Sequence, residues 1–406
     1  MIKLVDRFHC TGCAACANVC SHNAITMEYD EEGFLQPHIN YKKCVECGLC
    51  VKSCPQINPI EIPNTNINAY ALINKKDRSE SSSGGAFSAF ARVILKDGGV
   101  VFGASIDFDF KVKHIFIESV QDLYKLRGSK YIQSNIGNSY KEVRQFLRNQ
   151  RKVLFSGTPC QIAGLYNFLG KKRYEGLLIT LDLVCHGVPS QGCFDSYITK
   201  LQELPHYNNK IIEAFRFRKL DSWSIIPAVK FAKSKWKRLD LYENAYMNAF
   251  FEGITFRESC FNCSYCNTKR VGTFTIADFW VIGCQGKKFT KNVAAGVSLV
   301  IDNCGTMAKI YEKLSLEAYI EKRSLEEAIV QQANLKAPMI RSEIRDQAVK
   351  MMIDPKISLI DFSKKCGLPY RKNLKYLLTR IIKDIIDLFG LYNIYKTISY
   401  KIGKTS

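Results

Sequence analysis

Two runs of four cysteines stand near the start of the sequence, with the spacing of iron–sulfur ligands. The first run is Cys10-x2-Cys13-x2-Cys16-x3-Cys20, and the second is Cys44-x2-Cys47-x2-Cys50-x3-Cys54. In such runs three closely spaced thiolates hold one 4Fe–4S cluster, and the fourth ligates the neighbouring cluster. The pattern predicts two clusters, one held by Cys10, Cys13, Cys16 and Cys54, and the other by Cys20, Cys44, Cys47 and Cys50.

The alternative for these residues is a pair of zinc knuckles, which use isolated C-x2-C pairs and often histidine. Two matching sets of four cysteines favour clusters. Pro55 follows the second run, as is usual for iron–sulfur ligands, whereas Ser21 follows the first. This departure removes no ligand, so we expect two neighbouring clusters that conduct electrons over a short distance.

The cysteine content of the whole chain points the same way. Seventeen cysteines in 406 residues favour metal binding over disulfides, because a reducing compartment keeps thiols free. The opening residues MIKLVDRFHC lack the hydrophobic region of a secretory signal. No apolar run approaches the roughly 18 residues that a membrane-spanning helix needs. We therefore expect a cytoplasmic protein.

Charge is distributed unevenly along the chain, whose formal net charge is +20. Residues 1–64 carry five Lys/Arg and seven Asp/Glu, whereas the remainder carries 53 and 31. This predicts an acidic head that meets electron-transfer partners and a basic body that binds anionic cofactors or substrates. No helix-turn-helix, RNA-binding or zinc-finger signature is present, so we expect no nucleic-acid partner.

A Gly-rich segment, SSSGGAFSAF, places Gly84 and Gly85 at the start of a helical pattern. Backbone N–H groups and the positive end of a helix suit a phosphate or pyrophosphate there. The alternative is an ordinary turn capped by Ser82 or Ser83. The segment alone does not decide between them.

Two further segments carry groups that suit a cofactor. LRGSKYIQS sets Arg127, Lys130 and Tyr131 near a glycine, which fits a dinucleotide or merely a solvated helix start. KVLFSGTPCQIAGL is typical of a strand that runs into a helix, with residues 156–161 between them. Ligands of open α/β sheets bind at such carboxyl ends of strands.

In this order, SSGGAFSAF, GSKYIQS, LFSGTPCQIAGL, LDLVCHGVPS and RESCFNC…TFTIADFW resemble the coenzyme F420 hydrogenase/dehydrogenase beta-subunit family, over about residues 68 to 310. The resemblance implies an FAD-containing iron–sulfur oxidoreductase, with ferredoxin or another redox protein as partner. Its implied substrate is an F420-type deazaflavin or an organic molecule. Many bacterial members lie among polysaccharide-biosynthesis genes, which makes a glycan intermediate one candidate. Val281 follows Trp280 where the family usually has glycine, so the substrate side stays open.

The resemblance also implies a third 4Fe–4S cluster, held by Cys160, Cys185, Cys260 and Cys263. Local spacing alone would instead select Cys260, Cys263 and Cys266, with Cys284, as a zinc site. Either arrangement is compatible with the sequence, and Cys266 or Cys284 could replace a ligand of the third cluster.

The remaining implied site residues concern the flavin. Gly84, Gly85, Ser129, Lys130 and Tyr131 would line the pyrophosphate and ribose of FAD, and Thr158 with Gln161 would face the isoalloxazine. His186 follows a proposed ligand and would pass protons or donate to a sulfur. A structural histidine with satisfied hydrogen bonds is the alternative.

Strands must alternate with helices to position these groups. AYALI, GGVVFGAS, KVLFSG and LLITLDLVCHG read as strands, and SAFARVILK and KEVRQFLRNQ as helices. We expect an α/β (α+β) flavin-binding body with a mostly parallel or mixed sheet, preceded by a ferredoxin-like domain and followed by a helical tail. The predicted parts are a ferredoxin-type domain in residues 1–63, the family's N-terminal region in 68–150, its C-terminal region in 151–320 and a basic helical extension in 321–406.

The segment LKYLLTRIIKDIIDLFGLYNIYKTI in the tail predicts an amphipathic helix. Its apolar stripe would pack on the protein's own body or on a second copy, or would lie at the inner face of a membrane. For the whole chain we expect a reductase or other oxidoreductase. The alternative is a non-catalytic electron-transfer subunit of a larger complex.

Overall fold

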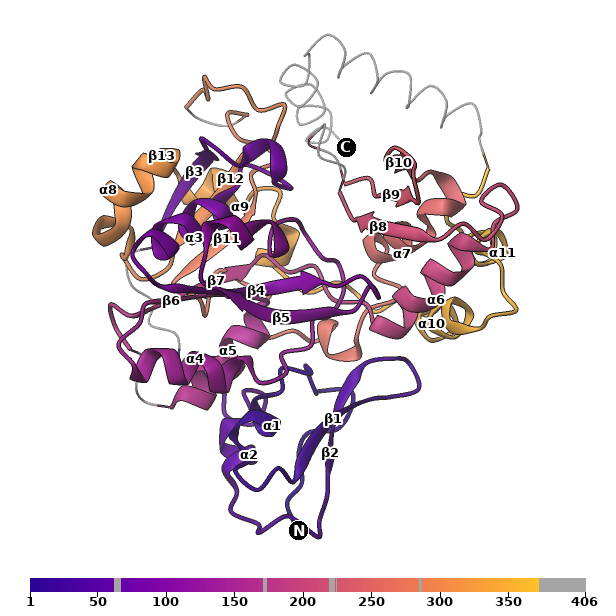
Figure 1. Ribbon diagram of the computed structural model, residues 1–406, viewed down its shortest axis with the longest axis horizontal. Coiled ribbons are helices and arrows are strands. Elements are labelled where there is room, and N and C mark those ends of the chain that lie inside the picture. Colours follow the sequence, from indigo (N-terminus) through magenta and orange to yellow (C-terminus); the bar gives the residue numbers. More distant parts are fainter. Residues whose placement is uncertain (62–66, 171–173, 219–222, 224, 285–286, 372–406) are drawn as a thin grey trace.

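The computed structural model describes residues 1–61, 67–170, 174–218, 223, 225–284 and 287–371. Three parts are visible in Figure 1: a small N-terminal head, a body built on one large sheet, and a lobe beside the body. The predicted amphipathic helix of the tail lies outside the described residues. Among the residues that are described, no helix is both long enough and apolar enough to span a membrane.

The head, residues 1–61, contains two short helices and one hairpin: α1 (Ala15–Val19), β1 (Ile25–Tyr29), β2 (Leu35–Ile39) and α2 (Leu49–Ser53). β1 and β2 pair antiparallel, with Ile25 opposite Ile39. The two cysteine runs are alike in backbone, because in each the residue before the short helix is left-handed, Ala14 at φ 59° and Gly48 at φ 73°. α1 and α2 both pack against α5 of the body, which fixes the head below the sheet (Figure 1).

The body is organised around an eight-stranded sheet in the order β13-β3-β12-β11-β7-β6-β4-β5. Its strands are β3 (Asn68–Asn74), β4 (Val100–Ile106), β5 (Val112–Ile117), β6 (Val153–Gly157), β7 (Leu178–Leu183), β11 (Phe274–Asp278), β12 (Ser298–Asp302) and β13 (Ala318–Arg323). The pairs β4/β6, β6/β7 and β7/β11 are parallel, and the other four pairs are antiparallel.

The sheet is therefore mixed, and the mostly parallel alternative was wrong. Only the central strands are joined by the helical crossovers that parallel pairing requires. β3, β12 and β13 come from distant parts of the chain and add antiparallel strands on one side. Because β4 pairs with β6, the boundary expected at residue 150 falls inside one continuous sheet.

Helices cover both faces of the sheet. Because successive side chains of a strand point to opposite faces, each strand contributes apolar residues to the core on either side. α3 (Ala86–Lys96) and α8 (Met307–Glu317) pack on one face with Leu154 of β6. α4 (Ser139–Arg148) and α5 (Pro159–Leu169) pack on the other with Val153 and Phe155. The core under α4 and α5 also includes Ala14 and Ala15 of the head, so head and body share apolar packing.

The lobe has a core of its own, dominated by aromatic side chains such as Phe194, Tyr197 and Tyr246. Its elements are α6 (Gln191–Gln202), β8 (Ile212–Arg216), β9 (Ala228–Phe231), β10 (Lys237–Arg238), α7 (Ala245–Phe251), α10 (Arg345–Ile353) and α11 (Leu359–Lys365). α9 (Leu325–Ile329) lies near β3 of the sheet. Short 3-10 helices complete the chain, η1 (Arg78–Glu80), η2 (Val120–Lys125), η3 (Leu241–Asn244), η4 (Glu258–Cys260) and η5 (Ala333–Leu335).

Candidate metal centre and cofactor site

The eight cysteines of the head gather around two cavities. Cys10, Cys13, Cys16 and Cys54 line one of them, and we call these four the proximal set. Cys20, Cys44, Cys47 and Cys50 line the other, and we call them the distal set. The grouping is the crossed one that the spacing predicts, with the fourth cysteine of each run facing the other run's cavity. The thiolate character of such a set fits a 4Fe–4S cluster.

The two sets differ in their exposure. Cys10 and Cys13 of the proximal set are buried, whereas in the distal set Cys50 alone is buried and Cys47 is exposed. Backbone amides point at sulfur in both, from Gly12 N to Cys10 Sγ at 3.4 Å and from Ala24 N to Cys20 Sγ at 3.3 Å. Such amides stabilise the negative charge of a ligating sulfur. The distal set thus faces solvent and the proximal set faces the body.

Four cysteines of the body also converge, and we call Cys160, Cys185, Cys260 and Cys263 the body set. Burial raises the pKa of the Cys185 thiol, and the neighbouring thiols of Cys260, Cys160 and Cys263 raise it further. Burial likewise raises the pKa of Cys160 to about 11, with Cys263 as a neighbour. Thiols with raised pKa values, such as those of Cys160 and Cys185, are neutral unless a metal takes their protons. The donor set fits a cluster, although the ligation itself stays a prediction.

Cys266 lies beside this set and keeps a rival arrangement open. Its thiol and that of Cys263 share a hydrogen bond that lowers the pKa of Cys263 to about 7 and raises that of Cys266. Among the described residues, no three His, Cys, Asp or Glu side chains come together as closely as a single metal ion requires. Four thiols around a cluster stand farther apart than four thiols on one zinc ion.

Helix α5 connects the proximal set to the body set. Cys160 lies in its first turn, and Gly164 lies one turn later on the same face. A Cβ atom at Gly164 would lie 3.0 Å from Cys13 Sγ, so a larger residue there would crowd this cysteine. Tyr265 lies close to both sets: burial raises its pKa, and the thiols of Cys160 and Cys13 raise that pKa further. The three sets therefore follow one another in the order distal, proximal, body.

Two buried arginines hold the head on the body. The guanidinium of Arg257 donates to the carbonyl oxygens of Cys10 and Leu35 and to the side-chain oxygens of Gln36 and Gln133, at 2.6–2.9 Å. Arg345 of α10 forms a two-pronged ion pair with Glu32 of the head, at 2.7 and 2.8 Å.

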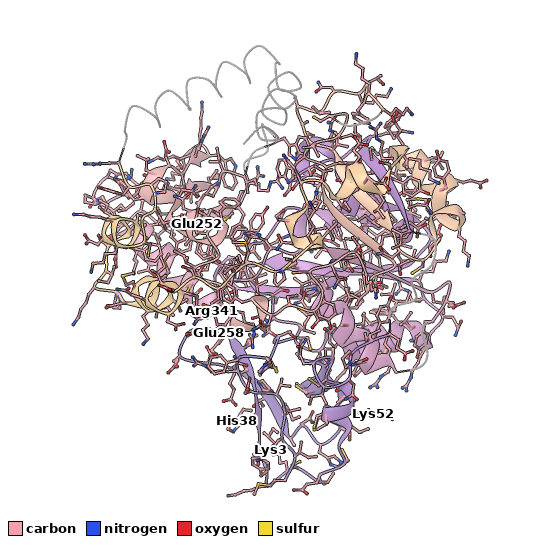
Figure 2. All side chains as sticks on the ribbon, turned by 180° about the vertical axis from the view of Figure 1, so that it is seen from behind. Lys3, His38, Lys52, Glu252, Glu258 and Arg341 are labelled. Carbon is pink, nitrogen blue, oxygen red and sulfur yellow. The ribbon has the colours of Figure 1, made fainter. Side chains whose placement is uncertain are left out.

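The same junction carries a more exposed pair beside these arginines. Figure 2 shows Arg341 next to Glu258 above the head, and their ion pair measures 2.8 Å. The head is thus fixed by charged side chains as well as by apolar packing.

The Gly-rich segment predicted for the flavin pyrophosphate packs tightly against strands. A Cβ atom at Gly84 would lie 2.3 Å from the carbonyl oxygen of Leu72 and from the amide of Ser298. Gly85 has φ +82°, a left-handed conformation that favours glycine. The first free amide of α3 donates to Ser298 Oγ at 3.3 Å. Strand packing therefore suffices to explain both glycines, and their contact with a pyrophosphate stays a prediction.

More positively charged than negatively charged side chains surround this segment. Arg92 and Arg127 both pair with Asp77, and Arg127 also lies 3.7 Å from the carboxylate of Glu80. Arg78 donates to the carbonyl oxygens of Asn292 and Gly296. Lys130 donates only to the carbonyl oxygens of Leu126 and Arg127 within the described residues, and burial lowers its pKa to about 7. Ser129 is tied to the segment through its amide and Ser82 Oγ, 2.9 Å apart. These residues fit an anionic group such as a pyrophosphate.

Ring contacts lead from this segment to the body set. The ring of Tyr131 lies 4.7 Å from that of Phe250, and Phe250 lies 5.2 Å from the His186 ring, measured between centroids. His186 Nε2 lies 3.3 Å from the carbonyl oxygen of Phe251, and Nδ1 lies 3.0 Å from the side-chain oxygen of Asn334. Both oxygens accept hydrogen bonds, so a neutral imidazole donates to one of them and a protonated one to both.

Thr158 and Gln161 form a capping box at the start of α5. The amide of Gln161 also donates to Ser134, at 3.0 Å to Oγ, and its side chain is buried. Thr158 Oγ1 lies 3.1 Å from Cys160 Sγ. These bonds give both residues a positioning role next to the body set, and their predicted contact with the isoalloxazine would come in addition.

Comparison with known proteins agrees with this picture. Residues 9–57 match the family model of a 4Fe-4S dicluster domain. Residues 150–328 match that of the C terminus of the coenzyme F420 hydrogenase/dehydrogenase beta subunit. This region belongs to the F420 hydrogenase/dehydrogenase beta-subunit family. The beta-subunit region contains all four cysteines of the body set, and the dicluster domain contains the proximal and distal sets.

Further comparisons add less. No curated protein sequence matches the chain. A chain of the xenon-derivatised F420-reducing [NiFe] hydrogenase complex from Methanosarcina barkeri resembles it in structure, at 16% sequence identity and a TM-score of 0.44. The alignment covers 77% of this chain and 98% of that chain.

Sequence reasoning missed the residues that join head and body. Arg257 stands three positions before Cys260, in the RESC stretch, and only its proximity to that cysteine could have drawn attention to it. Arg345 and Glu32 are 313 positions apart, and no pattern in the sequence relates them. Tyr265 lies between Cys263 and Cys266 in the sequence. An aromatic residue at that position does not by itself indicate a functional role.

Proposed function

We propose that this iron–sulfur electron-transfer protein is an FAD-dependent oxidoreductase, which exchanges electrons between a one-electron carrier such as ferredoxin and a two-electron substrate. The observation that carries the proposal is the order of the three cysteine sets, from the exposed distal set to the body set. Bound clusters supply one-electron transfer, and bound FAD links it to two-electron chemistry. The chain's own contribution is to hold these groups in sequence and to bind the carrier and the substrate at opposite ends.

The tip of the head suits an acidic carrier. Although the head has an acidic formal charge, the exposed cations Lys3, Lys42, Lys43 and Lys52 all lie on it near the distal set. Figure 2 shows Lys3 and Lys52 on the head, away from the lobe. Val45 and Leu49, which line the distal cavity, are 58% and 42% exposed. An apolar centre with a basic rim favours docking of a protein with an acidic surface.

The segment around Lys130 supports FAD as the cofactor. Arg78 and Lys130 are cations that donate to carbonyl oxygens only, within the described residues, so a pyrophosphate would supply the missing negative charge. Tyr131 and Phe250 then lie between this segment and His186, the neighbour of Cys185. The proposed binding residues remain Gly84, Gly85, Ser129, Lys130 and Tyr131, with Thr158 and Gln161 next to Cys160.

The substrate would be a deazaflavin of the F420 type or an organic acceptor, of which a sugar or lipid-linked glycan intermediate is one class. This part of the proposal depends on the family and not on a contact in the structure. Electron flow in the opposite direction, from a reduced deazaflavin to the carrier, would use the same residues.

The decisive experiment is an anaerobic titration of the purified full chain with reduced ferredoxin. The absorbance of bound flavin should bleach together with that of the clusters, and the bleaching should fail when the distal set is damaged by Cys47→Ser. Reduction of the clusters in a protein that binds no flavin would contradict the proposal. That outcome would favour a non-catalytic electron-transfer subunit of a larger complex.

A further inference from the structure

Arg257 differs from every other buried arginine in the part of the chain that the structure describes. Five arginine side chains are buried: Arg218, Arg257, Arg270, Arg323 and Arg345. Four of them pair with a carboxylate, Asp278, Asp182, Glu327 and Glu32 respectively. Arg257 is 1% exposed, and the oxygens that accept its hydrogen bonds are all neutral. Among the described residues, its charge therefore has no counter-charge.

An uncompensated buried cation is costly, because its hydration is lost and nothing of opposite sign replaces it. Cysteines of two sets lie close enough to feel this charge. Arg257 Nε donates to the carbonyl oxygen of Cys10 in the proximal set. In the body set, the Arg257 charge lowers the pKa of Cys160 and Cys260 against the larger effect of burial.

The surroundings of Arg257 are built to hold it at this point. Gly12, between Cys10 and Cys13, leaves room for the guanidinium, since a Cβ atom there would lie 2.8 Å from Nη1. Gln133 accepts a hydrogen bond from Nη1 of Arg257 and donates one to the carbonyl oxygen of Thr11. It therefore holds the guanidinium against the loop that carries Cys10 and Cys13. At its backbone, Arg257 precedes η4, which carries Cys260.

We propose that Arg257 is the shared counter-cation of the clusters bound by the proximal and body sets, and that it holds the reduction potentials of both above that of the distal cluster. Each 4Fe–4S cluster with four thiolates carries about two negative charges when oxidised and one more when reduced. A fixed positive charge in a low-dielectric junction favours the reduced state. Electrons that enter at the distal set would therefore be drawn toward the body.

The inference rests on the iron–sulfur part of the proposed function and not on the flavin. It is tested by EPR-monitored redox titration of the full chain, purified anaerobically, in three variants. Arg257→Gln removes the positive charge. Arg257→Lys keeps the charge but loses the planar array of N–H donors of the guanidinium. Arg345→Gln combined with Glu32→Gln is the matched control, because it removes a buried arginine of the same junction together with the carboxylate that cancels its charge. A Cys160→Ser protein identifies which signal belongs to the body set.

We expect Arg257→Gln to lower the potentials of the proximal and body clusters, shifting the partition of an electron between distal and proximal clusters at least tenfold, which is about 59 mV for a one-electron couple. Arg257→Lys should retain most of both potentials, and the double variant Arg345→Gln with Glu32→Gln should leave all three unchanged. Unchanged potentials in an Arg257→Gln protein with full iron content would overturn the inference. An equal shift in Arg257→Lys would also overturn it, since charge would then not be the cause.

The two proposals fail in different ways. A full complement of about 12 iron atoms with unshifted potentials removes the role of Arg257 alone. About eight iron atoms in the unmutated chain remove the body cluster, and with it the order of three sets on which the proposed function rests. If Arg257→Gln loses its clusters, Gln133→Glu tests the same charge, because it sets a carboxylate against Nη1 of Arg257. It should lower the same two potentials, and unchanged potentials in a Gln133→Glu protein with full iron content would overturn the inference.

Discussion

The head and the body bring four cysteines together in different ways. In the head, each cysteine set takes three ligands from one short loop and the fourth from the other, so local spacing almost determines the site. In the body, Cys160 and Cys185 follow neighbouring parallel strands β6 and β7, and Cys260 and Cys263 arrive from a turn far along the chain. A site of the second kind depends on the sheet, and it should be the more sensitive to single changes.

The largest expected effect is the loss of the body cluster in Cys160→Ser. Iron content should fall from about 12 to about eight atoms per chain, because one ligand of four is removed while the head retains both of its sets. Iron and sulfide analysis with EPR spectroscopy measures this. Cys266→Ser is the matched control, being a buried neighbour of the same set, and it should keep about 12 atoms. The reverse result would make Cys266 the ligand.

The attachment of the head should respond next most strongly. Arg345→Met leaves Glu32 without its partner in a poorly hydrated junction, and breaking such a pair costs about 3 kcal/mol. Denaturant unfolding of the loaded protein measures the loss. Arg345→Met combined with Glu32→Gln should recover part of it, because no unpaired carboxylate remains. Equal stability of Arg345→Met and the unmutated protein would show that the pair of Arg345 and Glu32 adds nothing to the attachment of the head.

The sequence predicts the cysteine sites of the head better than it predicts the site of the body. The crossed grouping of Cys20 and Cys54 follows from spacing, since both lie within one compact domain. Strands β4, β6 and β7 follow from their apolar runs, and so does the position of Cys160 at a strand's carboxyl end. The antiparallel strands β3, β12 and β13 do not, because strand pairing between distant segments leaves no local pattern. The same applies to Arg257, whose buried charge is apparent only from the packed junction.

Charge reversal at the tip of the head should weaken the encounter with an acidic carrier. Lys42→Glu with Lys43→Glu should lower the rate of reduction by ferredoxin roughly tenfold at low salt, and the difference should shrink as salt is added. Stopped-flow reduction measures this. Lys309→Glu with Lys350→Glu alters two exposed lysines of the body and the lobe, and it should have little effect. Equal slowing by both double variants would place the docking site elsewhere.

The body should show a pH dependence that the head lacks. Lys130 has a pKa of about 7 because burial disfavours its charged form, so the site loses a positive charge as the pH rises through that value. FAD affinity should therefore fall between pH 6 and 8, and Lys130→Met should weaken binding at pH 6 roughly tenfold and abolish the pH dependence. Flavin fluorescence measures binding. Lys125→Met, which removes an exposed lysine paired with Asp122, should behave as the unmutated chain.

The smallest expected effect concerns Thr158. Its hydroxyl lies 3.1 Å from Cys160 Sγ, and a hydrogen bond to a ligating sulfur raises the potential of the cluster. Thr158→Val should make the body cluster slightly harder to reduce, whereas Thr158→Ser should not. Identical potentials in both variants would mean that the hydroxyl serves only the helix cap. The clusters of the head should be unaffected in either case.

The central claim is that the chain binds a third cluster and a flavin in its body, in addition to the two clusters of its head. Anaerobic purification of the full chain, with iron, sulfide and flavin counted per polypeptide, tests it most directly. The account predicts about 12 iron atoms and one FAD. About eight iron atoms and no flavin would contradict it, because the body set would then be four half-buried thiols without a cluster.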